Sequence, residues 1–240
     1  WANRDTFIGV SGDFGRVRFG NVSSPTNSGY GSQVDQTYQL AGSGISMSSG
    51  AARHKHSVRF DSANYGGFEF AVSHQIKEAT AAVASPAADR ESRPAYANDF
   101  GVKYKSSLFS VQATVENRVN ATVKGKTDRH TQLSGGTSFG DLGLYAGYAE
   151  KRVATATAHK KNSGFGIAAN YKLDKLTFTG SLWNERDSVT DGVKADDDFR
   201  ALTLGVNYDI SKRTYAGFEF STQNESLAGK KDDRRATAFY

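Results

Sequence analysis

Two short motifs place arginine at alternate positions on one side of an extended segment: Arg16 and Arg18 in GRVRFG, and Arg59 in SVRFDS. Residues two apart in a β-strand point to the same face, so Arg16 and Arg18 share a face that Val17 does not. A guanidinium is always charged in proteins, and a set of them without an equal number of acids attracts anions. Lys103, in VKYK, is expected on the corresponding face of another strand.

No arrangement of residues indicates catalysis or a bound cofactor. There is no nucleophile elbow with Ser, His and Asp in order, no zinc-ligand spacing and no phosphate-binding loop ahead of a helix. Cysteine is absent, which excludes thiolate metal sites and a Cys nucleophile. His54, His56 and His74 lie in or beside expected loops without suitably spaced carboxylates, so we interpret them as surface residues. The acidic stretch at 191–199 lacks the closing Glu of a calcium hand, and we predict no metal, no cofactor and no enzymatic activity.

The elements that carry these side chains are β-strands. About eleven segments alternate apolar and polar residues at a period of two, and each ends in Gly, Asn, Asp or Ser. In LTFTGSLW (176–183) and ALTLGVNY (201–208), every second side chain is aliphatic or aromatic. Helical periodicity is weak and confined to residues 76–87, which we interpret as a loop. The predicted fold class is therefore all-β.

The lengths of the connections indicate where the apolar face is hidden. Short turns are expected at 12–15, 64–67, 105–107, 139–141, 173–175 and 210–212. Long polar connections are expected at 21–55, 74–98, 118–129, 152–162, 185–198 and 224–234. Sandwiches mix short and long connections at both ends, whereas membrane barrels keep short turns at one end and long loops at the other. We therefore predict a transmembrane antiparallel β-barrel.

The alternation assigns side chains to two faces, and one face carries no charge. Burying Lys or Arg at the bilayer midplane costs roughly 2–4 kcal/mol, so a charge-free stripe is expected of a lipid-facing surface. The expected lipid-facing residues are Val17, Phe19, Val58, Phe60, Val102, Tyr104, Val111, Ala113, Leu142, Leu144, Ile167, Tyr171, Leu176, Phe178, Leu202, Leu204, Val206, Tyr208, Phe218 and Phe220. The residues expected to face a water-filled lumen are Arg16, Arg18, Arg59, Glu69, Lys103, Gln112, Glu116, Asn170, Lys172, Thr203, Asn207, Asp209 and Glu219.

Composition is compatible with this fold. The net charge is +5, from 30 Lys and Arg against 25 Asp and Glu, and it is dispersed, so no nucleic-acid partner is predicted. No apolar run approaches the ~20 residues of a membrane-spanning helix. Aromatic residues near the expected strand ends are typical of the girdles at the two membrane surfaces: Tyr104, Tyr148, Tyr171, Tyr208, Phe139 and Trp183.

Four stretches together resemble the general porins of the Gram-negative outer membrane: NRDTFIGVSGDFGRVRFG, HSVRFDSANYGGFEFAVSH, SFGDLGLYAGY and LGVNYDISKRTYAGFEF. The resemblance implies a homotrimer of barrels with about 16 strands each, of which roughly 13 are covered here in a single domain spanning residues 1–240. It follows that about three N-terminal strands and the end of the last strand are expected to lie outside this sequence.

The resemblance also assigns a role to residues 21–55, the longest connection. They occupy the position of the family's third loop, which folds into the lumen and narrows the pore. In general porins this loop carries acids that face a basic ladder on the wall. Here its single acid is Asp35, whereas Arg16, Arg18 and Arg59 are expected on adjoining strands. Mild anion preference follows, with Lys103 as a further pore-lining residue.

The residues leave less specific alternatives for this site. Arg16 and Arg18 can equally be solvated side chains on a wet strand face. Arg59 can instead pair with Asp61, two residues further on the same face.

The expected function is a passive water-filled channel for small hydrophilic solutes and ions in the outer membrane of a Gram-negative bacterium. The expected partners are outer-membrane lipid, lipopolysaccharide and two further copies of the chain. One alternative with the same architecture is a channel selective for one class of anionic solute, whose conductance would saturate. The other is a soluble or surface-attached all-β binding module, which would need no detergent.

Overall fold

The described residues form one antiparallel sheet whose strands follow one another in chain order. The computed structural model describes residues 5–34, 53–76, 96–119, 126–154, 157–227 and 230–239. Thirteen strands lie on the main path, as predicted, and the two-residue β11 pairs with β10 beside it. The strands are β1 (Thr6–Gly12), β2 (Gly15–Ser23), β3 (Arg53–Ser62), β4 (Phe68–Gln75), β5 (Tyr96–Lys105), β6 (Phe109–Val119), β7 (Thr127–Phe139), β8 (Leu142–Ala154), β9 (His159–Leu173), β10 (Leu176–Thr190), β11 (Val193–Lys194), β12 (Phe199–Ser211), β13 (Thr214–Leu227) and β14 (Lys230–Phe239).

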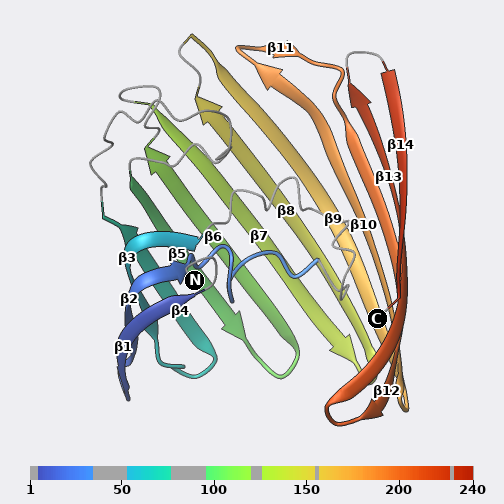
Figure 1. Ribbon diagram of the computed structural model, residues 1–240, viewed down its shortest axis with the longest axis horizontal. Helices are drawn as coiled ribbons and strands as arrows, with labels where there is room; N and C mark the ends of the chain where they lie inside the picture. Colours follow the sequence, from blue (N-terminus) through green and yellow to red (C-terminus); the bar gives the residue numbers. More distant parts are fainter. Residues whose placement is uncertain are drawn as a thin grey trace.

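The sheet is strongly curved, and its two edge strands lie far apart in the view of Figure 1. Within the described part of the chain, β1 pairs with β2 alone and β14 with β13 alone. No helix in these residues has the length and hydropathy that crossing a membrane requires.

Tight turns join the strands at one end of the sheet. The β9–β10 hairpin pairs Leu173 with Leu176, leaving a two-residue connection in which Asp174 has a φ of 53°. Asp tolerates this left-handed conformation because its side chain bonds locally to the backbone. Gly140, at the β7–β8 turn, has a φ of 59°, which glycine adopts without steric cost.

The central strands are longer than a bilayer requires. β9 and β10 have 15 residues each, which at about 3.3 Å per residue is about 50 Å. A hydrocarbon core of ~30 Å is crossed by ~9–11 tilted residues, so these strands continue well past it at their long-connection ends.

The predicted long connections are therefore too long, because strand residues extend into each of them, as at 152–154 in β8 and 159–162 in β9. Residues 185–190 continue β10, and the region 224–234 is almost entirely the β13–β14 hairpin. Polar residues on both faces hide the alternation there, yet the ladder persists because cross-strand ion pairs, such as Arg234 Nη2 to Glu225 Oε2 at 3.5 Å, suit a strand in water.

The predicted division into two faces is confirmed. On the outer face, apolar side chains are exposed, including Phe178, Leu202 and Leu204, the last with 51% of its surface accessible. On the inner face, Thr203 and Glu219 are fully buried. A face on which large apolar groups are exposed while polar groups are covered is the reverse of a soluble sheet and fits a lipid-facing wall.

One aromatic residue breaks the predicted girdle. Tyr104, Tyr148 and Tyr171 are exposed on the outer face, but Trp183 is only 1% exposed and lies on the inner face. The physical reason is its position in β10, where even-numbered residues such as Leu182 point outward and odd-numbered ones point inward.

A β-bulge resets the alternation at the start of β3. The pairing of β2 with β3 shifts between Gly20 and Val22, where Gly20 has a φ of 140° and His56 a φ of 49°. As a result His54 joins Arg59 on the inner face and is 2% exposed. The prediction that His54 is a surface residue is therefore wrong.

Candidate functional site

Residues 24–34, which follow β2, lie across the inner face of the sheet; we call them the crossing segment. Figure 1 shows the segment as a blue trace in front of the strands. Its contacts extend from β3 to β10, with Ser28 bonded to Arg59, Tyr30 against Gly101 and Val34 clustered with Trp183. It forms part of the range 21–55 that the sequence places in a lumen, and residues 35–52 of that range lie outside the described residues.

Hydrogen bonds to buried wall residues fix both parts of the crossing segment. Near its start, the Thr26 backbone N–H donates to Asp99 Oδ2 and the Thr26 hydroxyl donates to Asp99 Oδ1, both at 2.9 Å. Asp99 is 2% exposed, so these bonds replace the water that its carboxylate would otherwise need. Near the end, the Gln33 N–H donates to Ser134 Oγ on β7 at 3.1 Å.

Glycines on the inner face make room for the segment. A Cβ on Gly101 would lie 2.8 Å from Cβ of Tyr30, and a Cβ on Gly147 would lie 2.8 Å from a methyl of Val34. A Cβ on Gly166 would lie 2.8 Å from the other Val34 methyl. Because real Cβ atoms do not approach other heavy atoms so closely, any larger residue would push the segment away from the wall.

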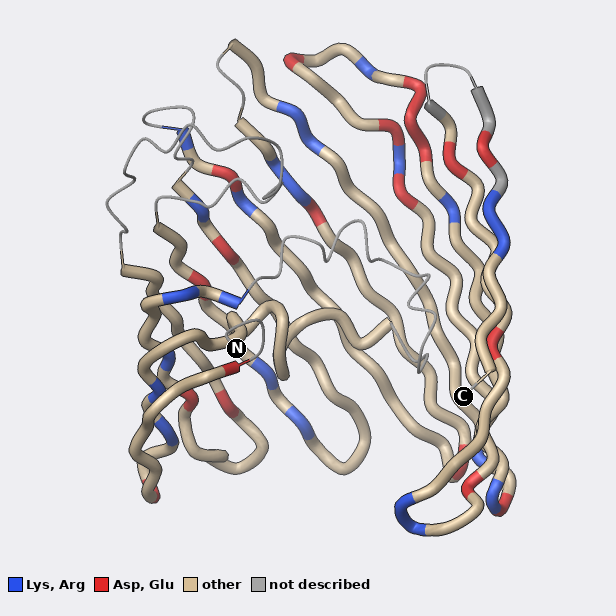
Figure 2. Tube along the Cα trace, in the orientation of Figure 1, with Lys and Arg blue, Asp and Glu red and all other residues tan. Residues whose placement is uncertain are grey.

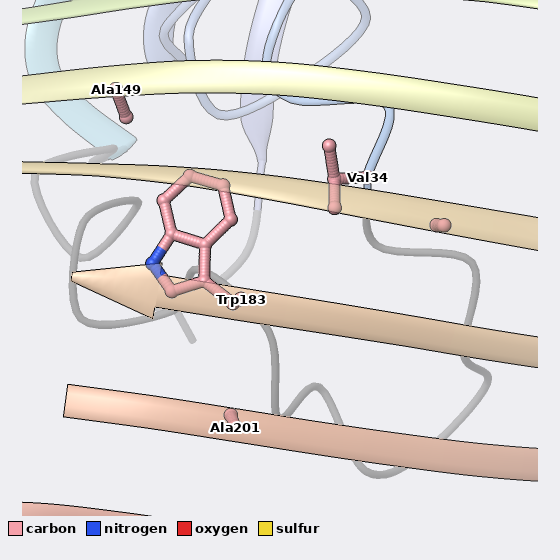
Figure 3. Close-up of a cluster of buried hydrophobic side chains, with 5 residues drawn as sticks. Val34, Ala149, Trp183 and Ala201 are labelled. Atoms are coloured by element: carbon pink, nitrogen blue, oxygen red, sulfur yellow. The ribbon is translucent and has the colours of Figure 1, made fainter.

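Trp183 and Val34 form a small apolar cluster where the segment meets β8–β12. Figure 3 shows the Trp183 ring extending from its strand toward Ala149, with Val34 beside it. Ala201 on the next strand is 1% exposed and completes the cluster with Ala168. The Trp183 indole N–H donates to Glu185 Oε1 at 3.1 Å, so this buried polar group is satisfied.

Arg18 and Arg59 share one carboxylate, Asp61. Arg59 Nη2 donates to Asp61 Oδ1 at 2.6 Å and Arg18 Nη2 donates to Asp61 Oδ2 at 2.7 Å. Arg59 also donates through Nη1 to the Ser23 carbonyl and to Ser28 Oγ, both at 2.7 Å. Arg59 therefore connects the wall to the crossing segment with charge-assisted hydrogen bonds, which are the stronger kind.

The remaining cations of the site are more accessible. The Arg16 side chain is 50% exposed and its Nη2 lies 3.9 Å from Asp61 Oδ2. Lys103 Nζ lies 3.1 Å from Glu69 Oε2 and 4.9 Å from the centre of the Tyr30 ring. Lys103 thus combines an ion pair with a cation–π contact to the crossing segment.

The pKa of the Tyr30 phenol is raised above its ordinary value. Burial raises its pKa, the nearby carboxylates Asp61 and Glu69 raise it further, and together they outweigh Arg59 and Arg16 to give a pKa of about 12. The phenol stays neutral over the physiological range.

The structure brings three of the five predicted site residues together. Arg16, Arg18 and Arg59 surround Asp61, and the pairing of Arg59 with Asp61 that the sequence left open is present. Arg18 and Arg59 are buried at 6% and 2%, so neither is a solvated strand residue. Asp35 lies outside the described residues.

Sequence reasoning missed a buried polar group beside the site. His54 Nε2 lies 3.1 Å from Glu116 Oε1, which also accepts from Arg118 Nε at 2.7 Å. Glu116 is fully buried, and His130 lies directly opposite it on β7. The alternation of Glu116 and Arg118 was a visible signal, but the bulge that turns His54 toward them was not.

Among the described residues, an acidic cluster at the long-connection end of the sheet has the arrangement that most resembles a cation-binding site. The carboxylate oxygens of Asp187, Asp196 and Asp198 lie within 4.8 Å of one another, and Asp187 is paired with Lys194 at 3.1 Å. The carboxylate of neighbouring Asp197 instead accepts hydrogen bonds from the Ser188 N–H and from Lys160 Nζ.

Figure 2 shows how charge is distributed along the strands. Lys, Arg, Asp and Glu gather toward the two ends of the sheet, and the middle sections of β7–β10 are mostly uncharged. An uncharged middle with charged ends is typical of a wall that crosses hydrocarbon.

This fold and charge pattern define the class of outer-membrane β-barrel proteins. The sequence profile of the Gram-negative porin family matches residues 1–226, so the chain belongs to that family. Its predicted place in the outer membrane is confirmed by the same match and by the relatives. The chain is 28% identical to the chitoporin of Vibrio furnissii over 81% of its length and 24% identical to the major outer membrane protein P.IB of Neisseria gonorrhoeae over 90%. It spans 58% and 66% of the length of these two relatives.

Solved structures share the fold at lower identity. The outer-membrane protein OmpT of Vibrio cholerae superposes with a TM-score of 0.74 at 16% identity, covering 99% of this chain and 81% of that one. The anion-selective porin of Comamonas acidovorans gives a TM-score of 0.73 at 14% identity, covering 98% of this chain and 78% of that one. The predicted all-β antiparallel fold is confirmed as that of porin barrels.

Proposed function

We propose that this chain forms most of the wall of a passive, water-filled channel through the outer membrane for small hydrophilic solutes and ions. The observation that carries the proposal is the division of one sheet into an exposed apolar outer face and a polar, charged inner face, with a segment lying across the latter. A polar interior of this kind is typical of barrels that hold water.

In this proposal the crossing segment is part of the loop that narrows the pore. It lies on the inner face between β5 and β10, where it reduces the open cross-section. Its bonds to Asp99 and Arg59 hold it against the wall rather than free in the lumen.

Mild anion preference follows from the charges around the segment. Arg16, Arg18, Arg59 and Lys103 form their ion pairs with two acids, Asp61 and Glu69, so these pairs carry an excess of two positive charges. Arg16 is the exposed member and would present that charge to passing ions. A low-dielectric wall concentrates the potential of such charges in the lumen. The solved anion-selective porin shares the fold, and its selectivity is a property of that protein.

Current through planar bilayers tests the channel and its selectivity. In a gradient of potassium chloride, the reversal potential should show anion preference, and Arg16→Gln should reduce that preference. Val17→Gln, one residue away on the outer face, serves as the control. Cation preference in the unmodified protein would contradict the selectivity, and absence of conductance would contradict the channel.

We propose outer-membrane lipid, including the phosphate groups of lipopolysaccharide, as a partner of the outer face. Arg129, Arg152 and Lys161 are direct cross-strand neighbours on β7–β9, at the long-connection end beyond the exposed Tyr148. Cations opposite one another repel, and Glu150, 2.6 Å from Arg152 and 2.9 Å from Lys161, neutralises only one of the three. Anionic headgroups would neutralise the rest.

A homotrimer is proposed on the family's assembly and on a solved OmpT of Vibrio cholerae described as a trimer, which has the same fold at a TM-score of 0.71. The exposed apolar outer face does not support the alternative of a soluble all-β binding module. A channel selective for one class of anion is favoured by one further feature of the inner face, described next.

A further inference from the structure

A cavity of about 400 Å³ lies on the inner face at the turn end of β5–β8, directly beside the crossing segment. Gly29 and Gln33 of that segment form one side. The strands contribute Lys103, Lys105 and Ser110 from β5 and β6, and Ser138 and Tyr145 from β7 and β8. Its volume is within the range of about 300–1,000 Å³ typical of small-molecule sites.

The charge of the cavity is positive because only one of its two lysines is neutralised. Glu69 is already held by Lys103 Nζ at 3.1 Å and by the Asn64 side-chain amide at 2.9 Å. Lys105 is exposed, lines the cavity, and its ammonium has no ion-pair partner among the described residues. A solute that enters would therefore meet one available cation.

The wall behind Lys105 carries hydroxyl groups. Lys105 pairs with Ser110, Ser110 with Gly136, and Gly136 with Tyr145, so these four residues form one row across β5–β8. A Cβ on Gly136 would lie 2.4 Å from the Tyr145 ring, which shows that the ring lies against the wall at this glycine. The Tyr145 hydroxyl is held by the Asn170 amide at 3.2 Å, which fixes the ring beside the cavity.

We propose that this cavity is a binding station for small hydroxylated organic anions on their way through the channel. The carboxylate or phosphate of the solute would pair with Lys105, and its hydroxyl groups would face Ser110, Ser138 and the Tyr145 ring. The inference rests on the proposed channel function and specifies the class of solute. Binding should be weak, because a solute that conducts must also leave.

The test is saturable block of chloride current in the full chain reconstituted in planar bilayers. Glucose 6-phosphate is the probe, glucose the neutral control and inorganic phosphate the control without hydroxylated carbons. Glucose 6-phosphate should reduce the current with saturation, and at lower concentrations than either control.

Lys105→Gln should raise the half-blocking concentration about five- to tenfold, the size expected for one charge-assisted hydrogen bond in a partly hydrated site. Lys105→Arg should retain most of the binding. Lys172→Gln removes a lysine near the same rim that does not line the cavity, and it should leave the half-blocking concentration unchanged.

Three outcomes would overturn the proposal that this cavity binds hydroxylated organic anions. Equal block by glucose would show that charge plays no part, equal block by inorganic phosphate would remove the organic class, and equal effects of Lys105→Gln and Lys172→Gln would remove the site. Conductance without saturable block overturns the station and leaves the channel intact, whereas absence of conductance overturns the channel itself.

Discussion

The two ends of the crossing segment are held to the wall by different forces. At its start, toward β2–β5, buried charges fix it: Asp61 joins two arginines and Arg59 donates to Ser28. At its end, toward β8–β10, no charge is involved; Val34 fits over Gly147 and Gly166, beside Trp183.

The difference indicates how each end responds to change. Buried ion pairs are costly to break from one side, because the remaining partner is left charged without compensation. The close packing of Val34 over the glycines is sensitive instead to side-chain volume, since added atoms in a filled space force the neighbours to move. Substitutions at the start should therefore act through charge, and substitutions at the end through size.

The largest effect is expected from Arg59→Ala. It removes a donor from Asp61, from the Ser23 carbonyl and from Ser28 of the segment, and breaking a buried pair in this way costs about 3–5 kcal/mol. The free energy of unfolding, measured with urea for protein in phospholipid vesicles, is the readout. Arg16→Ala is the matched control: half exposed and 3.9 Å from Asp61, it should cost less than about 1 kcal/mol. Equal losses for the two variants would show that Arg59 is not an anchor.

Gly166→Val tests the steric end. Its side chain would enter the space of Val34 and the Trp183 ring, and overpacking of this kind costs up to about 3 kcal/mol. The displaced segment should also lower the single-channel conductance. Gly180→Val, on the neighbouring strand β10, is the control, because a Cβ there meets its nearest neighbour, Leu204, at 3.4 Å. An unchanged conductance in Gly166→Val would refute the packing of Val34 over Gly166.

Thr26→Val should cost about 2 kcal/mol by removing the hydroxyl that donates to the buried Asp99 carboxylate. Thr26→Ser keeps the hydroxyl and should retain most of the stability. Urea unfolding of both variants compares them directly. A loss in Thr26→Ser as large as in Thr26→Val would assign the effect to packing of the methyl group.

Tyr30 gives the smallest and most specific effect. Because its pKa is raised to about 12, the folded protein keeps the phenolic proton while the unfolded chain loses it near pH 10. The contribution to stability is complete below pH ~10 and is lost as pH rises toward ~12. In an alkaline titration followed by tyrosinate absorbance, Tyr30→Phe should remove a late step and leave the steps near pH 10. A late step that persists in the variant would belong to another tyrosine.

The sequence alone was sufficient for the two faces of the sheet and the number of strands. Val17 and Phe178 point outward and Arg18 and Thr203 inward, as a period of two requires, because lipid tolerates no charge on its side. Arg16, Arg18 and Arg59 were placed on one face by the same rule, and the register brings their strands side by side.

Other features depend on information that periodicity does not contain. The bulge at Gly20 and His56 turns His54 inward toward Glu116, and a single bulge cannot be located from alternation in a segment this polar. Trp183 was assigned to a girdle from its ring rather than from its odd position in β10. The path of the crossing segment depends on glycines of three strands that are distant in sequence.

Adjacent cysteines on β2 test the central claim most directly, because the chain has no cysteine of its own. Arg16→Cys places a thiol on the inner face and Val17→Cys places one on the outer face. A membrane-impermeant, charged thiol reagent should change the single-channel current of Arg16→Cys and leave that of Val17→Cys unaltered. Equal responses of the two, or a response of Val17→Cys alone, would contradict an aqueous path along the inner face.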